Sequence, residues 1–167
     1  MEVTRFPADM DKDTFLTSFS VQMLDCIKAG MGSSYEQEFT PEGDESWFHY
    51  LRKNLDDGVN YILLSSDGRF RGYAVWKQHG DSIHIYDLII RPEYQMDIIT
   101  LRKLLVLLAE DISGLDASKL WAYTNYRNMR MNSILTRHGF TETERKRNGT
   151  VYTADLRNFI NKFSKER

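Results

Sequence analysis

The segment with the clearest chemical potential lies near the middle of the chain, where an apolar strand meets a proline and then a leucine-rich helix. It reads Asp87-Leu-Ile-Ile-Arg-Pro-Glu-Tyr-Gln95, and the helix is expected from Ile98 onward. The first amides of a helix have no carbonyl partner within the helix and point outward, so they can bind an anion such as a phosphate. This junction is therefore the first place to expect a functional site.

Two side chains just before the junction can exchange protons. His84 and Tyr86 alternate with their neighbours along the strand, which places them on one face together with Leu88. Asp87 is expected on the opposite face, toward helices or solvent. An imidazole titrates near neutrality and suits a proton relay. A histidine that is hydrogen-bonded to a tyrosine inside a crowded sheet is an equally good interpretation of the same pair.

The elements around the junction predict a mixed, mostly antiparallel sheet flanked by helices, which is an α+β fold. Asp67-Gly68 and Asn148-Gly149 are favoured hairpin pairs between apolar runs. The helix after the junction acts as a crossover, so the next strand should run parallel to the strand before it. Strands are expected at residues 61–65, 70–77, 83–90, 119–124, 140–146 and 150–156.

Helices are expected on both sides of this strand region. In the first third, Asp11 or Asp13 can cap a helix that ends at Gly30 or Gly32, and Asp44 can cap a second one. The later helices are expected at residues 98–112 and 128–138. The segment 31–43 between the first two helices is predicted to be a loop; it is either a lid or acceptor-binding segment or an ordinary connection.

The composition is that of one compact domain over residues 1–167. The chain is 41% hydrophobic and has a single cysteine, Cys26, so it can bury a core without disulfides or metal. The start lacks an apolar signal core, and the longest apolar run, 104–109, is too short to cross a membrane. A cytoplasmic protein without membrane or metal contacts is expected. The histidines His49, His79 and His138 lack metal-ligand spacing.

Positive charge is concentrated late in the chain, although the net charge of the whole is −2. A solvated helix and hairpin tip explain this cluster most simply, and nucleic-acid binding is a weaker alternative. The basic residues are Arg127, Arg130, Arg137, Arg145, Lys146 and Arg147.

The order of elements and two motifs resemble the GNAT superfamily of acyl-CoA-dependent N-acetyltransferases, over nearly the whole chain. Leu88-Ile-Ile-Arg-Pro-Glu-Tyr-Gln95 looks like the family's strand end followed by a Pro-Glu-Tyr-Arg type loop. Asn128, Arg130 and Ile134, followed by His138-Gly-Phe140, are similar to the family's Asn-rich helix that leads to a Gly-Phe pair. The resemblance implies a single GNAT-like domain.

The resemblance also implies roles for particular residues. Acetyl-CoA would be the co-substrate, and an amine would accept the acetyl group, with Glu36 and Glu38 favouring a cationic acceptor. His84 and Tyr86 fall where some family members carry the residues that relay the acceptor's proton. A homodimer is a further possibility. The residues that would bind the coenzyme are Ile89, Ile90, Arg91, Gln95, Met96, Asp97, Ile98, Ile99, Thr100 and Asn128.

The chain also departs from the family pattern. Met96, Ile98 and Thr100 occupy positions where family members have glycines, which let backbone amides approach the coenzyme's pyrophosphate. Leu135 stands where many members have a tyrosine that protonates the departing thiolate. Two hypotheses therefore remain: an N-acetyltransferase, or a GNAT-fold binding or assembly module without catalysis.

Overall fold

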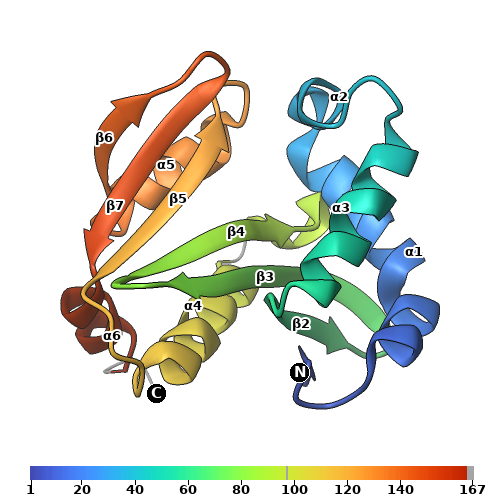
Figure 1. The fold of residues 1–167 in the computed structure, drawn as a ribbon, viewed down its shortest axis with the longest axis horizontal. Helices are drawn as coiled ribbons and strands as arrows, with labels where there is room; N and C mark the ends of the chain where they lie inside the picture. Colours follow the sequence, from blue (N-terminus) through green and yellow to red (C-terminus); the bar gives the residue numbers. More distant parts are fainter. Residues whose placement is uncertain (97, 165–167) are drawn as a thin grey trace.

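A seven-stranded sheet organises the structure, a computed structural model that describes residues 1–96 and 98–164 (Figure 1). The strand order is β1-β2-β3-β4-β5-β7-β6, and every neighbouring pair is antiparallel except the parallel pair β4 and β5. The strands are β1 (Glu2–Phe6), β2 (Asn60–Ser66), β3 (Arg69–His79), β4 (Ser82–Ile90), β5 (Lys119–Asn125), β6 (Thr141–Arg145) and β7 (Gly149–Asp155). The predicted mixed, mostly antiparallel sheet is confirmed.

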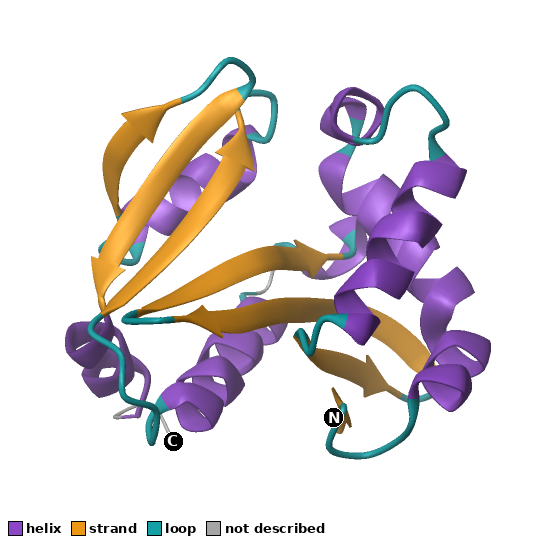
Figure 2. Cartoon of the chain, in the orientation of Figure 1, coloured by secondary structure: helices purple, strands orange, loops and turns teal. Residues whose placement is uncertain are grey.

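Helices cover both faces of the sheet and bury two separate cores (Figure 2). The helices are α1 (Lys12–Met31), α2 (Ser33–Glu38), α3 (Asp44–Asp56), α4 (Ile99–Ile112), α5 (Met129–Arg137) and α6 (Leu156–Ser164), with a short 3-10 turn at Pro92–Tyr94. α4, α5 and α6 pack on one face, and α1, α2 and α3 pack on the other. None of the helices in the described ranges is long and apolar enough to span a membrane.

Local signals in the sequence explain several element boundaries. Asp11 caps α1 by accepting a hydrogen bond from the Thr14 amide at 2.8 Å, and the helix ends at Gly32, whose φ is +56°. Asp67 and Gly68 both have positive φ, as the tight hairpin between β2 and β3 requires. Asp44 is not the cap of α3, because Gly43 holds that position and the Asp44 carboxylate accepts a hydrogen bond from Tyr35 instead.

Three elements were not predicted from the sequence: β1, α2 and α6. α2 lies inside the segment predicted to be a loop, and α6 begins at Leu156, where the last predicted strand was expected to end. The last hairpin is also displaced by one residue from the prediction. Lys146 donates to the Gly149 carbonyl oxygen at 2.7 Å, so Arg147 and Asn148 form the turn. Gly149 belongs to β7, and this position takes a glycine because a Cβ there would collide with the Thr124 carbonyl oxygen.

An irregularity in β4 decides which side chains face the site. Val75 pairs with Asp87 while the next residue, Trp76, pairs with Ile85, so Tyr86 is an extra residue in the strand, a β-bulge. Beyond the bulge the alternation is reversed. Asp87 therefore shares a face with His84 and Tyr86, while Leu88 packs into the opposite core. The predicted placement of Asp87 and Leu88 is wrong for this reason.

The only parallel pairing in the described sheet is short. β4 and β5 pair from Ser82 and Lys119 to Ile85 and Ala122, and beyond this point the two strands diverge (Figure 1). The carboxyl ends of both strands therefore enclose a V-shaped space. The helices α1, α2 and α3 stand on one side of this space, and the paired strands β5 and β7 stand on the other (Figure 1).

Candidate active site

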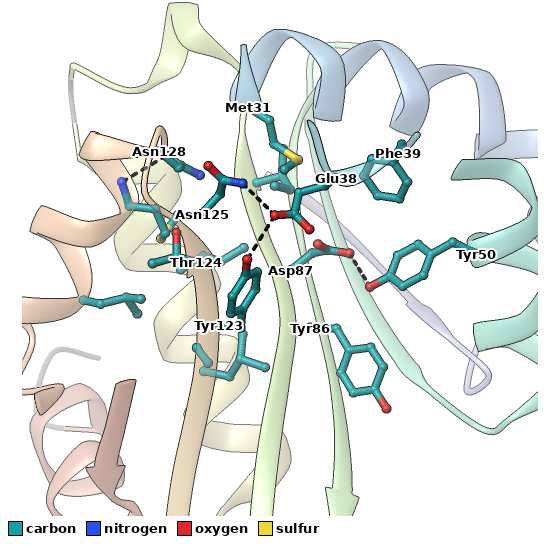
Figure 3. A pocket seen from close by; sticks show the side chains of 16 residues that line it. Met31, Glu38, Phe39, Tyr50, Tyr86, Asp87, Tyr123, Thr124, Asn125 and Asn128 are labelled. Carbon is teal, nitrogen blue, oxygen red and sulfur yellow. Dashed lines mark hydrogen bonds between the residues drawn. The ribbon is translucent and has the colours of Figure 1, made fainter. Parts of the chain in front are cut away.

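A cavity of about 260 Å³ occupies the space where β4 and β5 diverge (Figure 3). Strands β4 and β5 supply its floor, the ends of α1 and α2 and the middle of α3 form one wall, and α5 forms the other. The lining residues are Met31, Glu38, Phe39, Tyr50, Ile85, Tyr86, Asp87, Leu88, Ile89, Ala122, Tyr123, Thr124, Asn125, Asn128, Met131 and Leu135. Sequence motifs that lie far apart in the chain thus meet at one site.

Asp87 presents a carboxylate to this cavity from the bulged part of β4. Its Oδ2 accepts a hydrogen bond from the Tyr50 hydroxyl at 3.2 Å. Burial raises the pKa of Asp87 to about 7, and the nearby Glu38 adds to the rise, while the Tyr50 hydrogen bond opposes it. A carboxyl group with this pKa can accept and release a proton near neutral pH.

Glu38 faces the same cavity from the end of α2, and its position is fixed by two donors on β5. Its Oε1 accepts hydrogen bonds from Asn125 Nδ2 at 2.6 Å and from the Tyr123 hydroxyl at 3.1 Å (Figure 3). The neighbouring Gln37 also accepts from Asn125, at 2.9 Å. α2 therefore bridges the V-shaped space and holds Glu38 opposite Asp87. Glu36, the other predicted acceptor residue, is exposed and does not line the cavity.

His84 and Tyr86 are the predicted proton relay, but they do not direct their polar groups toward Asp87 in the cavity. The His84 ring stacks on Trp121 at 3.5 Å between ring centroids, outside the cavity lining, and burial lowers the pKa of His84 to about 4. Tyr86 lines the cavity, but its hydroxyl lies 2.9 Å from His79 Nε2 and points away from Asp87 (Figure 3). The Tyr86 hydroxyl therefore meets His79 and not His84, so the expected hydrogen bond between His84 and Tyr86 is not formed. The catalytic assignment of His84 and Tyr86 stays a prediction.

The edge of β4 that faces the V-shaped space offers backbone hydrogen-bonding groups. The Arg91 amide donates to Arg71 on the β3 side at 3.0 Å, so alternation along an antiparallel pair directs the amides and carbonyls of Leu88 and Ile90 away from β3. Gln95 Nε2 donates to the Ile90 carbonyl oxygen at 2.9 Å. Ile89, between them, faces the α1 side of the sheet. A ligand with amide groups could extend the sheet here.

The predicted phosphate-binding residues follow this edge. Arg91 is held in ion pairs with Asp25 and Glu93, both at 2.6 Å. Met96 is 87% exposed and Ile98 50%, and Ile98 has a φ of +55°, so neither packs into the core. Ile99 is also exposed, Thr100 is buried with no hydrogen-bond partner for its hydroxyl oxygen among the described residues, and Asp97 lies outside the described residues.

The α5 side of the cavity carries the second predicted motif. Asn128 lines the cavity, and its Oδ1 caps α5 by accepting from the Met131 amide at 3.2 Å. Leu135 lines the cavity as an apolar side chain. The Tyr123 hydroxyl, on β5, is a candidate proton donor in the lining, although burial and the adjacent Glu38 raise its pKa to about 12. The described residues contain no cluster of acids, histidines or cysteines suited to a metal ion.

No protein-family model matches the sequence, and no curated protein matches it either. Solved structures do match the fold. PaiA N-acetyltransferase from Thermoplasma acidophilum, solved with coenzyme A, has a TM-score of 0.68 at 13% identity, over 93% of this chain and 99% of that one. An acetyltransferase from Streptococcus agalactiae has a TM-score of 0.70 at 13% identity, over 92% and 97%. Aminoglycoside 6'-acetyltransferase type Ii has a TM-score of 0.67 at 11% identity, over 93% and 97%.

These structures define the class of fold. The chain has the fold of the GNAT-family acetyltransferases, over almost its whole length and almost the whole length of each of these neighbours. The resemblance inferred from the sequence is confirmed at this level. With identities of 11–13%, the likeness shows the architecture, and the chemistry must be argued from the residues of this chain.

Proposed function

We propose that this protein is an N-acetyltransferase that moves an acetyl group from acetyl-CoA to a primary amine. The observation that carries the proposal is the pair of carboxylates, Asp87 and Glu38, that faces the cavity between the diverging ends of β4 and β5. An amine acceptor must lose a proton and must be held next to the acyl donor, and the two carboxylates suit these two tasks.

The coenzyme fits the described residues best along β4. The outward backbone groups of Leu88 and the outward amide of Ile90 match the amides of a pantetheine arm, which would follow Ile89, Ile90 and Arg91 like an additional strand. The Gln95 side chain would give up the Ile90 carbonyl oxygen to the arm. In this proposal Asn128 contacts the arm from α5, and the segment from Gln95 to Thr100 meets the phosphates. When bound, the coenzyme supplies the thioester carbonyl that the amine attacks.

The side chains would then divide the chemistry as follows. Asp87, with a pKa near 7, takes a proton from the bound ammonium group, because only the neutral amine has the lone pair that attacks. Glu38 attracts the cationic acceptor into the cavity. A C–N bond forms and the C–S bond breaks, and the departing thiolate needs a proton that Leu135 cannot supply. The Tyr123 hydroxyl or solvent would provide it.

The test is an acetylation assay with acetyl-CoA and a panel of primary amines, followed by mass spectrometry. We expect N-acetylated amine and free coenzyme thiol in equal amounts, and no thiol release when the amine is left out. Binding of acetyl-CoA without transfer to any amine or to any peptide N-terminus would contradict the proposal.

A GNAT-fold binding or assembly module is the second candidate. It is favoured by the residues in the segment that was expected to bind the phosphates. Met96 and Ile98 replace glycines, and Arg91 is already engaged by Asp25 and Glu93. A melting temperature that does not respond to acetyl-CoA or longer acyl-CoAs would support this candidate, because a ligand that binds only the native state must stabilise it.

The proposed N-acetyltransferase is also proposed to be a single domain over residues 1–167, to be located in the cytoplasm and to form a homodimer.

A further inference from the structure

We infer that the acceptor is a small primary amine that bears no carboxylate, the kind of compound that decarboxylation of an amino acid produces. This inference rests on the proposed function, since it names the substrate of the same cavity. It follows from the sign of the charges in the cavity, from the way those charges are fixed, and from the cavity's size and walls.

The charges that line the cavity are all of one sign. Among the described residues of the lining, Glu38 and Asp87 are the only ionisable acids, and arginine, lysine and histidine do not occur. Arg91, which follows β4, is engaged by Asp25 and Glu93. Arg130, at the start of α5, contacts the Gln95 carbonyl oxygen. An acceptor that carries an ammonium group finds partners here, whereas a carboxylate on the same molecule meets only like charges.

The side chain of Glu38 is fixed by hydrogen bonds, so it cannot easily move away from the carboxylate of a bound amino acid. Glu38 is held by the Tyr123 hydroxyl and by Asn125 Nδ2, and Asn125 also holds Gln37 on the same helix. Two like charges about 6 Å apart, at an effective dielectric constant of about 20, repel each other by enough to weaken binding about a hundredfold. An α-amino acid should therefore bind far more weakly than the amine that its decarboxylation yields.

The cavity is also small and has aromatic walls. Its volume of about 260 Å³ exceeds the roughly 150 Å³ of a cavity that holds benzene and falls below the range of typical drug sites, about 300–1,000 Å³. Phe39, Tyr50, Tyr86 and Tyr123 surround it, and aromatic faces attract ammonium groups. The coenzyme would take the part of this space beside Leu88, Ile89 and Asn128, so the acceptor is limited to one ring or a short chain with an amine. Decarboxylation of an amino acid is a reaction that yields such an amine.

The experiment compares matched pairs that differ by one carboxylate: tyramine with tyrosine, and cadaverine with lysine. Binding is measured by calorimetry without coenzyme, and kcat/KM is measured with acetyl-CoA. We expect at least one of the two amines to bind about a hundredfold more tightly than its parent amino acid, and kcat/KM to show the same preference. Equal binding within both pairs, or no binding of either amine, overturns the inference.

The two readouts separate this inference from the proposed function. If an amine binds preferentially and is never acetylated, the proposed function fails, and what remains is the preference of the cavity for an amine without a carboxylate. If the amino acids are acetylated as well as the amines, the function stands and the inference fails.

A matched pair of variants tests the origin of the preference. Glu38→Gln keeps the hydrogen bonds from Tyr123 and Asn125 and removes the charge, so it should reduce the amine-over-amino-acid ratio by about tenfold or more. Glu45→Gln makes the same charge change on the exposed side of α3 and should leave the ratio unchanged. An equal effect of both variants would show that the net charge, and not the cavity, sets the preference, and would overturn the inference.

Discussion

In the proposed function Asp87 accepts the proton of the amine, whereas the sequence alone pointed to His84. Asp87→Asn should lower kcat about 10²–10⁴-fold while leaving the affinity for acetyl-CoA nearly unchanged, because Asn cannot accept the amine proton. His84→Ala serves as the comparison. His84 lies outside the cavity lining, so its replacement should leave kcat within a few-fold of the wild type. The reverse result would return the proton relay to His84.

The raised pKa of Asp87 also predicts how the stability of the protein depends on pH. Folding raises the pKa of Asp87 from 3.8 to about 7, so the folded state holds the proton more tightly than the unfolded chain does. The contribution of Asp87 to the free energy of unfolding therefore falls as pH rises from about 4 to about 7, by at most about 4 kcal/mol. Asp87→Asn should become progressively more stable than the wild type over this range. Urea denaturation at several pH values measures the difference, and parallel curves would refute the raised pKa.

The site residues could be predicted from the sequence only in part. Of the residues singled out in the sequence, Glu38, Asn128 and Leu135 line the cavity, and their roles stay predictions. Asp87 was assigned to the wrong face because strand alternation assumes that no residue is inserted, and the bulge at Tyr86 reverses the pattern. No residue type in the segment marks a bulge. The neighbouring His84 looked more suitable for proton transfer because its unperturbed pKa is near neutrality.

Among the elements, α2 has the most direct effect on the site, because it connects the two sides of the V-shaped space. Asn125→Ala removes the donor that holds both Gln37 and Glu38. We expect faster amide hydrogen exchange in residues 33–38 and weaker amine binding, since Glu38 loses its fixed position. Asn161→Ala, on the exposed side of α6, is the control. Unchanged exchange in α2 would mean that the helix is held by its own packing.

A second prediction concerns strands β3 and β4, which approach each other closely at Gly72. A Cβ at Gly72 would lie 2.5 Å from the Ile89 carbonyl oxygen, so Gly72→Ala must push the two strands apart. We expect a loss of about 1–3 kcal/mol of stability together with weaker acetyl-CoA binding. Gly114→Ala, where an added Cβ meets no atom within 4 Å, is the matched control. Equal stability of the two variants in urea would contradict the tight packing at Gly72.

The elements that could be predicted are those with strong local signals. The Asp67-Gly68 turn and the apolar period of α4 led to the correct strands and helix. β1 and α2 escaped prediction because they are short and their sequences gain a clear preference only through packing. α6 did carry a local signal, since Leu156, Phe159 and Phe163 recur at helical spacing after Asp155, which accepts from the Asn158 amide. β1 pairs only with β2 among the described strands, and α6 packs its buried Phe159 and Phe163 against the α4 side of the sheet. These contacts join segments that are distant in the sequence.

At the scale of the whole molecule, the diverging strands divide the sheet into two parts that meet only over the short pairing of β4 with β5 (Figure 1). Contacts that cross the open end include Gln37 of α2 with Asn148 in the last hairpin at 3.3 Å, and Arg130 of α5 with the Gln95 carbonyl oxygen beyond β4. A coenzyme that pairs with the outward edge of β4 would fill the space between the two parts. The proposed transfer depends on this placement, because an amine in the cavity can be acetylated only if the thioester of the coenzyme lies next to it.

An NMR titration of the isotope-labelled protein with acetyl-CoA tests this claim most directly. The backbone amides of Leu88 and Ile90 point away from β3, so binding along this edge should shift both signals in a saturable manner, together with that of Asn128. The amide of Ile62, buried in the middle of β2, should remain unchanged and serves as the internal reference. If saturating acetyl-CoA shifts no signals, or only signals outside the space between β4 and β5, the coenzyme does not bind along the outward edge of β4.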